Sequence, residues 1–358
     1  IEVNPDAINI AEKLDEERAA GQVRGPLHGI PVMIKDNIDT GDKMMTTAGS
    51  LALVGPPAAK DAFIVEKLRN AGAVLLGKTN LSEWANFRSE RSSSGWSGRG
   101  RQCRNPYAMD RNPCGSSSGS GAAVSANLCA ITIGTETNGS IVCPANANGV
   151  VGIKPTVGLW SRSGIIPISH TQDTAGPMAR TVADATALLG PLCGIDETDS
   201  RSITSDGHFQ LDYTRFLDPN GLRGKRIGIW RATMGFHEKV DEVLEKSFDL
   251  MRSAGAEIID KVDITGHHQT GGAGYQVMLY EFKHGLNQYL ASRTGIGIGS
   301  LQDLIEFNKA NRDRSMPYFG QERLLLAQEK GNLDTLEYRE SLEKVVRLSR
   351  EEGIDQTL

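Results

Sequence analysis

Serine and glycine crowd the stretch from Asn112 to Leu128, NPCGSSSGSGAAVSANL. A serine hydroxyl becomes an effective nucleophile only when a neighbouring base removes its proton. The seven histidines are scattered along the chain, and His170 alone lies near a segment of this kind. A lysine can replace histidine as the base if loss of water keeps its amine neutral. The stretch therefore indicates either a flexible linker or a loop that carries serine-based acyl transfer.

Two other segments carry residues of the types that this chemistry needs. Lys35 ends the apolar run GIPVMIK, a place where an ammonium group would lose water. Ser140 lies in GTETNGSIVCPA, which follows an apolar run. Taken alone, Lys35 is better interpreted as an ordinary surface lysine at the end of a strand. The residues by themselves leave its role open.

Two short motifs suggest other functions but lack the local structure that these functions require. GAVLLGKT, residues 72–79, matches a phosphate-binding loop, yet its apolar centre predicts a strand, which cannot wrap around phosphate. GSSSG, residues 115–119, matches a nucleophile elbow at Ser117, but a turn-rich loop stands where the elbow needs a strand. We interpret the first motif as structural and reject the elbow.

The elements that would position these residues alternate between strand and helix. Hydrophobic periodicity and Gly or Pro stops predict strands at 29–36, 73–79, 130–136, 149–156, 225–231 and 256–263, and helices at 5–20, 62–72, 119–128, 181–192 and 239–255. This alternation predicts an α/β layer fold with a mixed or parallel sheet. From about residue 274 to 353 the pattern becomes helical.

Composition limits the remaining classes of protein. The chain has 358 residues, of which 39% are hydrophobic, and a net charge of −5, so a large nucleic-acid interface is not expected. No apolar run is long enough to cross a bilayer. The five cysteines include no CxxC pair, which favours a reduced cytoplasmic protein over a periplasmic or secreted one. Because the chain starts at Ile1 rather than Met, a removed leader peptide and export from the cytoplasm remain alternatives. The sequence contains no cluster of metal-ligating residues.

Six segments between residues 26 and 186 resemble the sequence blocks of the amidase signature family and occur in the same order as in that family. They are GPLHGIPVMIKDNI, AGAVLLGKTNLSEWAN, NPCGSSSGSGAAV, GTETNGSIVCPA, GVVGIKPTVG and DTAGPMARTVADA. Within that family, four segments look most like the bacterial peptide amidases: NLSEWANFR, GTETNGSIVCPA, LYEFK and LIEFN. The resemblance implies a mixed β-sheet flanked by helices, with a helical insertion at about 274–353. It implies a single domain over residues 1–358 that lacks the expected C-terminal portion.

The resemblance also implies a Ser-cisSer-Lys triad. Lys35 would be the base, Ser116 the shuttle in a cis peptide bond and Ser140 the nucleophile, while Ser117 would hold Lys35 by a second hydrogen bond. The oxyanion hole would consist of the backbone N–H groups of Thr137, Asn138, Gly139 and Ser140. No metal or organic cofactor is implied. On this basis the Gly/Ser stretch is an ordered catalytic loop.

The implied reaction is hydrolysis of a carboxamide to acid and ammonia through an acyl-enzyme, with the C-terminal amide of peptides as the favoured substrate. A general aliphatic or aryl amidase and the glutaminase subunit of a tRNA-dependent amidotransferase remain alternatives. A catalytically inactive binding protein is a further alternative. The expected partner is a peptide or small-molecule amide, with neither nucleic acid nor membrane, and the oligomeric state is not indicated.

Some residues near the triad depart from the family pattern or invite other interpretations. Val142 stands where the family often has arginine, so an ion pair through that position is not expected, and Asn138 replaces a glycine. Cys143 is expected to be a buried small residue and Asp173 to cap a turn. Packing is the expected role of Trp84 and Trp96.

Overall fold

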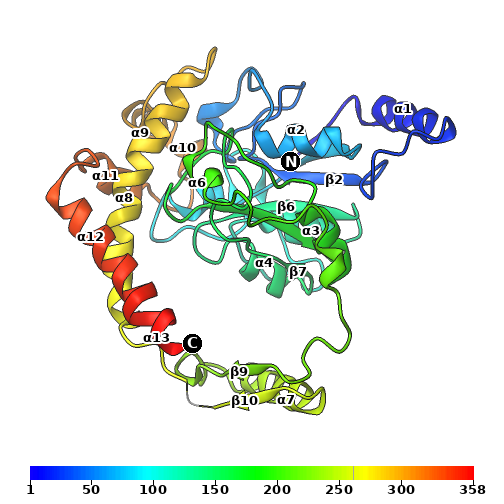
Figure 1. Cartoon of the computed structure of the whole chain (residues 1–358). Coiled ribbons are helices and arrows are strands. Elements are labelled where there is room, and N and C mark those ends of the chain that lie inside the picture. The colour runs from blue at the N-terminus through cyan, green and yellow to red at the C-terminus, as the bar shows by residue number, and fades with distance from the viewer. Residues whose placement is uncertain (261) are drawn as a thin grey trace. The chain divides into compact units, whose positions relative to one another are not determined.

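In the computed structural model, which describes residues 1–260 and 262–358, the apolar runs of the first half form the central strands of a mixed sheet (Figure 1). The strand order is β1-β3-β2-β6-β8-β7. The strands are β1 (Glu2–Val3), β2 (Pro31–Lys35), β3 (Val74–Thr79), β6 (Ile131–Glu136), β7 (Val151–Gly152) and β8 (Thr174–Ala179). β3, β2 and β6 are parallel, whereas β1, β8 and β7 run antiparallel to their neighbours. The predicted α/β class with a mixed sheet is confirmed.

Alternation along β2 sends its side chains to two different layers. Val32 and Ile34 lie in the main core with α2 (Phe63–Asn70) and α5 (Val182–Leu189). Met33 packs on the opposite face, against α3 (Ser118–Ser125). Because successive side chains of a strand alternate between faces, Lys35 shares the face of Met33. In Figure 1, α2 lies on one side of the sheet, and α3 and α4 (Val142–Ala147) lie on the other.

Small residues let α3 approach the sheet closely. The Ser120 carbonyl oxygen accepts a hydrogen bond from Thr132 Oγ1 of β6 at 3.1 Å. A Cβ atom on Gly119 would lie 2.6 Å from the backbone nitrogen of Asn80, just after β3. Only glycine fits at that point without a shift of backbone.

The described chain divides into two compact units. The first contains residues 1–214 and 279–331, and the second contains residues 215–278 and 332–358. Besides the main sheet and its helices, the first unit contains α1 (Ala7–Ala19), β4 (Trp96–Ser97), β5 (Arg101–Gln102), α6 (Ser200–Ile203), α9 (Leu301–Ala310), α10 (Arg312–Ser315) and α11 (Glu322–Gln328). The second contains β9 (Arg226–Gly228), α7 (Glu238–Ser253), β10 (Glu257–Ile259), α12 (Leu336–Val346) and α13 (Asp355–Thr357). The residues of α8 (His267–Ser292) are divided between the units.

Short helical segments complete the secondary structure. They are η1 (Leu51–Leu53), η2 (Glu83–Asn86), η3 (Thr214–Phe216), η4 (Arg231–Thr233) and the π-helical η5 (Arg347–Ile354). The predicted helical segment at 274–353 is confirmed by α8, α9, α11 and α12. The expectation of a single domain stays a prediction.

The later predicted strands are shorter in the structure than in the sequence pattern. The strand expected at 149–156 is reduced to β7, and the one at 225–231 to β9. The one expected at 256–263 contains β10, and its residue Lys261 lies outside the described residues. β9 and β10 pair with each other in a separate parallel sheet. The family resemblance did not cover residues 225–263, where only local pattern was available.

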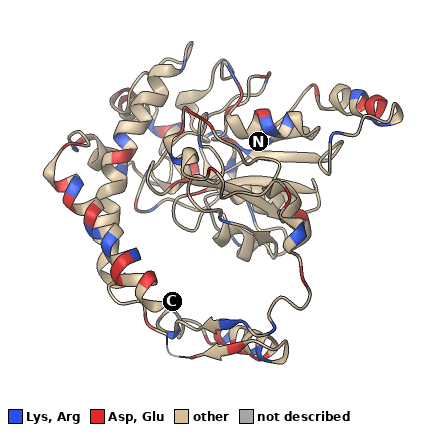
Figure 2. Ribbon diagram, in the orientation of Figure 1, with Lys and Arg blue, Asp and Glu red and all other residues tan. Residues whose placement is uncertain are grey.

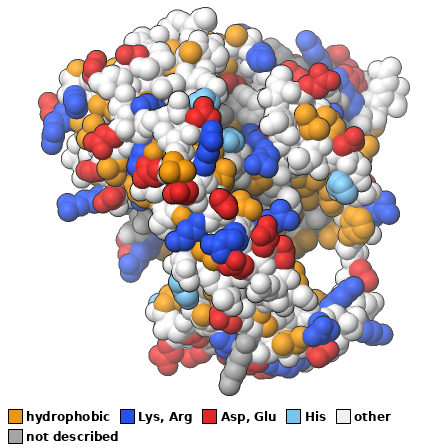
Figure 3. Space-filling model, turned by 60° about the vertical axis from the view of Figure 1, so that its left-hand side comes forward, with side chains coloured by type: hydrophobic (Ala, Val, Ile, Leu, Met, Phe, Trp, Pro, Cys, Tyr) orange, Lys and Arg blue, Asp and Glu red, His pale blue; other side chains and the backbone are white. Residues whose placement is uncertain are grey.

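Charges of both signs alternate on the helices of the surface. Figure 2 shows Lys and Arg interspersed with Asp and Glu along α7 and α12. The face in Figure 3 has the same mixture, with small hydrophobic patches between the charges. Among the described residues, no helix has the length and apolar character needed to cross a membrane.

Candidate active site

Lys35, the last residue of β2, is completely buried. Its Nζ lies 2.7 Å from Ser116 Oγ, 2.9 Å from Thr135 Oγ1 and 3.2 Å from the Thr135 carbonyl oxygen. Burial lowers the pKa of the amine to about 7, although the carboxylates of Asp173 and Glu136 oppose the shift. A buried lysine with this pKa is neutral in a large fraction of molecules at pH 7.

The Gly/Ser loop that precedes α3 supplies Ser116. The peptide bond between Gly115 and Ser116 is cis, and the Ser116 carbonyl oxygen accepts from Ser82 N at 3.0 Å. The Ser117 N–H donates to the Ser140 carbonyl oxygen at 3.1 Å, so the loop and the Ser140 turn are directly joined. These bonds, and the complete burial of Ser116 and Ser117, make the loop an ordered part of the core.

Ser117 supports Lys35 through Thr135. Its Oγ donates to the Thr135 carbonyl oxygen at 3.1 Å and accepts from Thr135 N at 3.2 Å. In the described part of the chain, the hydrogen-bond partners of Lys35 are Ser116 and Thr135. The second hydrogen bond expected from Ser117 to Lys35 is therefore made by Thr135, because the Ser117 hydroxyl is bonded to the backbone of Thr135 in β6.

Glu136, at the end of β6, holds the turn that carries Ser140. Its carboxylate accepts from the backbone N–H groups of Gly139 at 2.8 Å, Ile141 at 2.7 Å and Val142 at 3.0 Å. Lys154 Nζ lies 3.6 Å from the same carboxylate. The cation that the family pattern places at position 142 is thus supplied from another segment. The Gly139 N–H, one of the expected oxyanion donors, is already bonded to Glu136.

A disulfide bond joins the Gly/Ser loop to the Ser140 turn. Cys114, immediately before the cis bond, is bonded to Cys143 in α4, with 6.1 Å between their Cα atoms. The expectation that Cys143 is a buried small residue is wrong, because its side chain is exposed and oxidised. The expectation of reduced cysteines is wrong for this pair. The two residues are 29 positions apart, so proximity arises only when the loop and turn pack together.

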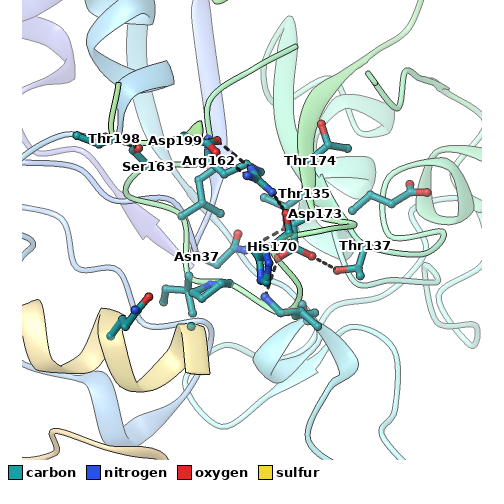
Figure 4. A pocket seen from close by; sticks show the side chains of 18 residues that line it. Asn37, Thr135, Thr137, Arg162, Ser163, His170, Asp173, Thr174, Thr198 and Asp199 are labelled. Carbon is teal, nitrogen blue, oxygen red and sulfur yellow. Dashed lines mark hydrogen bonds and ion pairs between the residues drawn. The ribbon is translucent and has the colours of Figure 1, made fainter. Parts of the chain in front are cut away.

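A cavity of about 250 Å³ lies beside this network (Figure 4). Thr135, Thr137 and Asn37 line the side nearest to Lys35. Asp173 also lines it, and its carboxylate accepts from Thr137 Oγ1 at 2.5 Å and from the backbone N–H groups of Ile168 and Ser169. The expected turn-capping role of Asp173 is confirmed, and the contact with Thr137 is additional.

Two side chains of the cavity wall, Arg162 and His170, lie beside carboxylates. Arg162 Nε and Nη2 donate to the two carboxylate oxygens of Asp199, at 2.9 and 2.5 Å. His170 Nδ1 lies 3.4 Å from Glu281 Oε1, and burial lowers the pKa of this histidine. His170 lines the cavity, whereas the ionisable side chain hydrogen-bonded to Ser116 is Lys35.

The other motifs have the structural roles expected of them. Lys78 is buried in β3, where it donates to the Ile38 carbonyl oxygen at 2.6 Å and to Thr46 Oγ1 at 2.8 Å, so GAVLLGKT is a strand. Trp84 and Trp96 are both buried, as expected for packing. Asn37 and Thr135 were not anticipated. The sequence places Asn37 two residues after Lys35, in the segment IKDN. Its hydrogen bond to Thr135 forms only because β2 pairs with β6, which local sequence does not show.

Comparisons with known proteins agree on one family. A family model described as Amidase matches residues 1–352. A putative amidase of Schizosaccharomyces pombe is 42% identical over 383 residues, covering 100% of this chain and 66% of the relative. The crystal structure of peptide amidase from Stenotrophomonas maltophilia superposes with a TM-score of 0.95 at 50% identity, covering 100% of this chain and 72% of that chain.

More distant relatives include one of the subunits of glutamyl-tRNA(Gln) amidotransferase. The protein from Acaryochloris marina is 41% identical over 254 residues, covering 70% of this chain and 51% of the relative. The chain spans just under two thirds of the length of the Schizosaccharomyces relative and about half of the length of the Acaryochloris relative.

Proposed function

The chain belongs to the amidase family, and from that premise we propose that it hydrolyses carboxamides to acid and ammonia, with Ser140, Ser116 and Lys35 as its catalytic triad. The observation that carries the proposal is the buried amine of Lys35, hydrogen-bonded to Ser116 and with its pKa lowered to about 7. We further propose that the substrates are peptides with a C-terminal amide.

The partners of Lys35 support its role as a base. A neutral amine has two N–H groups and one lone pair. Thr135 offers two acceptors, its carbonyl oxygen and its hydroxyl oxygen. The lone pair then accepts the hydroxyl proton of Ser116, at 2.7 Å. In this arrangement Ser116 has an acceptor for its proton, as the proposed transfer from Ser140 to Lys35 requires.

The reaction follows as acyl transfer in two steps. Ser140 Oγ attacks the amide carbon while its proton passes through Ser116 to Lys35. The proton returns along the same path to the nitrogen of the substrate, the C–N bond breaks, and ammonia leaves. Water then attacks the acyl-enzyme, using the same residues as base, and the acid is released with Ser140 restored.

Glu136 supports the turn around the developing oxyanion. We propose that the oxyanion is bound by backbone N–H groups of the same turn, those of Thr137, Asn138 and Ser140, whereas the Gly139 N–H is bonded to Glu136. Removing one such donor commonly costs a hundredfold or more in kcat, roughly 3 kcal/mol. A turn held by three hydrogen bonds to one carboxylate keeps these donors in place without rearrangement during the reaction.

The preference for peptide amides rests on the match to peptide amidase at 50% identity and on the cavity wall. Ile166, Pro167 and Ile168 form an apolar side, and the Arg162–Asp199 pair is internally neutralised. Such a wall suits an uncharged peptide segment better than the charged α-amino and carboxylate groups of free glutamine.

Ammonia release from a short peptide amide tests the proposal. Wild-type protein should release ammonia, and Ser140→Ala should not. Ser205→Ala, a buried serine outside the site, serves as the control for an alanine substitution. Equal release by wild type and Ser140→Ala would mean that Ser140 is not the nucleophile. A wild-type protein that hydrolyses acetamide or anilides but not peptide amides would contradict the substrate assignment.

A further inference from the structure

Two buried polar atoms near the triad have no hydrogen-bond partner within the described chain, the Trp84 Nε1 and the Asn37 Oδ1. Trp84 and Asn37 are 2% and 3% exposed, so these atoms do not form hydrogen bonds with bulk water. An indole N–H can only donate, and an amide oxygen can only accept. Buried polar groups in folded proteins are nearly always paired, directly or through an ordered water. These two atoms are complementary in type.

Both residues line the same small void, of about 10 Å³. Its other walls are apolar residues: Ala48, Ala85, Ile166, Pro167, Ile168 and Phe282. This volume is at the lower limit for a single water, which needs at least two polar partners. Asn37 and Ala85 also line the larger cavity of Figure 4, so the void adjoins the candidate substrate site.

We propose that this void binds one water molecule, which accepts from Trp84 Nε1 and donates to Asn37 Oδ1, and that Trp84 thereby acts as a positioning residue for Lys35. The direction of the bonds is set by the indole. Because Trp84 can only donate, the water turns its oxygen to Trp84 and a hydrogen to Asn37. The amide oxygen of Asn37 is then held toward the void.

The opposite end of the same amide reaches the Lys35 network. Asn37 Nδ2 donates to Thr135 Oγ1 at 3.0 Å, and Thr135 Oγ1 is 2.9 Å from Lys35 Nζ. The water thus keeps the positive end of the Asn37 amide dipole toward Lys35, which favours the neutral amine. Without it the amide is free to turn over and present its oxygen. That oxygen would act in the same direction as the carboxylates of Asp173 and Glu136, which favour the ammonium form.

The bound water is tested by NMR, independently of any catalytic activity. The chain contains four tryptophans, so ¹⁵N-tryptophan labelling gives four indole signals, and Trp84→Phe identifies the one of interest. We expect a cross-peak between the Trp84 indole proton and a long-lived water. Trp160, whose Nε1 donates to the Leu189 carbonyl oxygen at 2.8 Å, is the matched buried indole and should show none. A Trp84 signal without a water cross-peak would overturn the proposal.

The positioning role rests on the proposed function of Lys35 and is tested by kinetics. Trp84→Phe should lower kcat for a peptide amide at pH 7 about tenfold and leave KM nearly unchanged. The acid limb of its pH profile should move to higher pH. Trp160→Phe loses a buried indole N–H away from the site and should keep the wild-type limb. An unshifted limb in folded Trp84→Phe would refute the positioning role.

Two outcomes distinguish failure of the proposed function from failure of the water site. If wild-type protein releases no ammonia, the proposed function fails, while the NMR cross-peak still decides whether the water is bound. If Trp84→Phe does not fold, the wild-type indole signal is assigned by elimination from Phe variants of the other tryptophans, and absence of its water cross-peak still refutes the site.

Discussion

The amine nitrogen of Lys35 lies 2.7 Å from the hydroxyl oxygen of Ser116, and neither side chain is exposed to solvent. The Ser116 oxygen can give its proton only to a lysine that has already lost one. The protonation state of a single buried amine therefore controls the first step of the proposed reaction.

The pH dependence of hydrolysis should show this control. The pKa of Lys35 is lowered to about 7 by burial, and the active form is the neutral one, present above that pH. We expect kcat/KM for a peptide amide to fall about tenfold per pH unit below about pH 7 and to level off above it. Initial rates of ammonia release between pH 5 and 9 measure this. A profile that stays flat down to pH 5 would contradict it.

Removing the buried amine should stabilise the protein near neutral pH. The unfolded chain holds the Lys35 proton up to about pH 10.5, whereas the folded chain loses it near pH 7, so folding is penalised below pH 10.5 and fully so below pH 7. We expect Lys35→Met to raise the free energy of unfolding at pH 7 by about 2 kcal/mol, after subtraction of the lost hydrogen bonds.

Urea denaturation at pH 7 and pH 10 measures the effect, because the advantage of Lys35→Met should shrink or reverse at the higher pH. Ser116→Ala keeps the buried amine and is the control that should retain the wild-type pH dependence. A stability difference between Lys35→Met and wild type that is the same at pH 7 and pH 10 would show that the buried amine carries no such penalty.

Glu136→Gln should lower kcat strongly while the fold is retained. Glutamine can present one oxygen, but its amide N–H group would face backbone N–H donors of Ile141 and Val142. We expect a loss of about a hundredfold, typical of a displaced catalytic group, with KM changed less. Lys154→Met removes the partly exposed ion pair at 3.6 Å and the hydrogen bond to the Thr137 carbonyl oxygen at 3.0 Å, and it should cost less than about tenfold in kcat because the carboxylate of Glu136 still holds the turn. A larger loss of kcat in Lys154→Met than in Glu136→Gln would contradict the role of Glu136 in holding the turn.

The disulfide should be detectable by counting thiols. Denatured protein without reductant should show three free thiols, those of Cys103, Cys129 and Cys193, and five after reduction. Closing a 29-residue separation by a disulfide stabilises by about 3–4 kcal/mol, so Cys143→Ala should be less stable by that order. Cys103→Ala, a thiol outside the pair, is the control. Five thiols before reduction would exclude the bond.

Local sequence pattern predicted the strands that carry the chemistry. β2 ends at Lys35 and β6 at Glu136, where apolar runs give way to polar residues. Strand β8, between β6 and β7, was not predicted because TAGPMA contains glycine and proline, which normally argue against a central strand. Pro177 is tolerated opposite Ile133, and its carbonyl oxygen accepts from Ile153 N.

Local sequence pattern does not predict contacts between segments that lie far apart in the chain. The roles of Lys35, Ser116 and Ser140 came from a resemblance and stay predictions until activity is measured. Thr135 and Asn37 meet because β2 pairs with β6, and the Cys114–Cys143 bond depends on how a loop and a turn pack. Spacing along the chain contains no signal for either contact.

The close packing of α3 against the segment after β3 has a consequence for mutational tolerance. GSSSGSG has the composition that protein engineers choose when a segment must accept almost any change. Here an alanine at Gly119 would clash with the backbone of Asn80, because its methyl carbon would lie only 2.6 Å away. Gly119 therefore has no room for a larger side chain, and a scan of single substitutions should find this stretch among the least permissive of the chain.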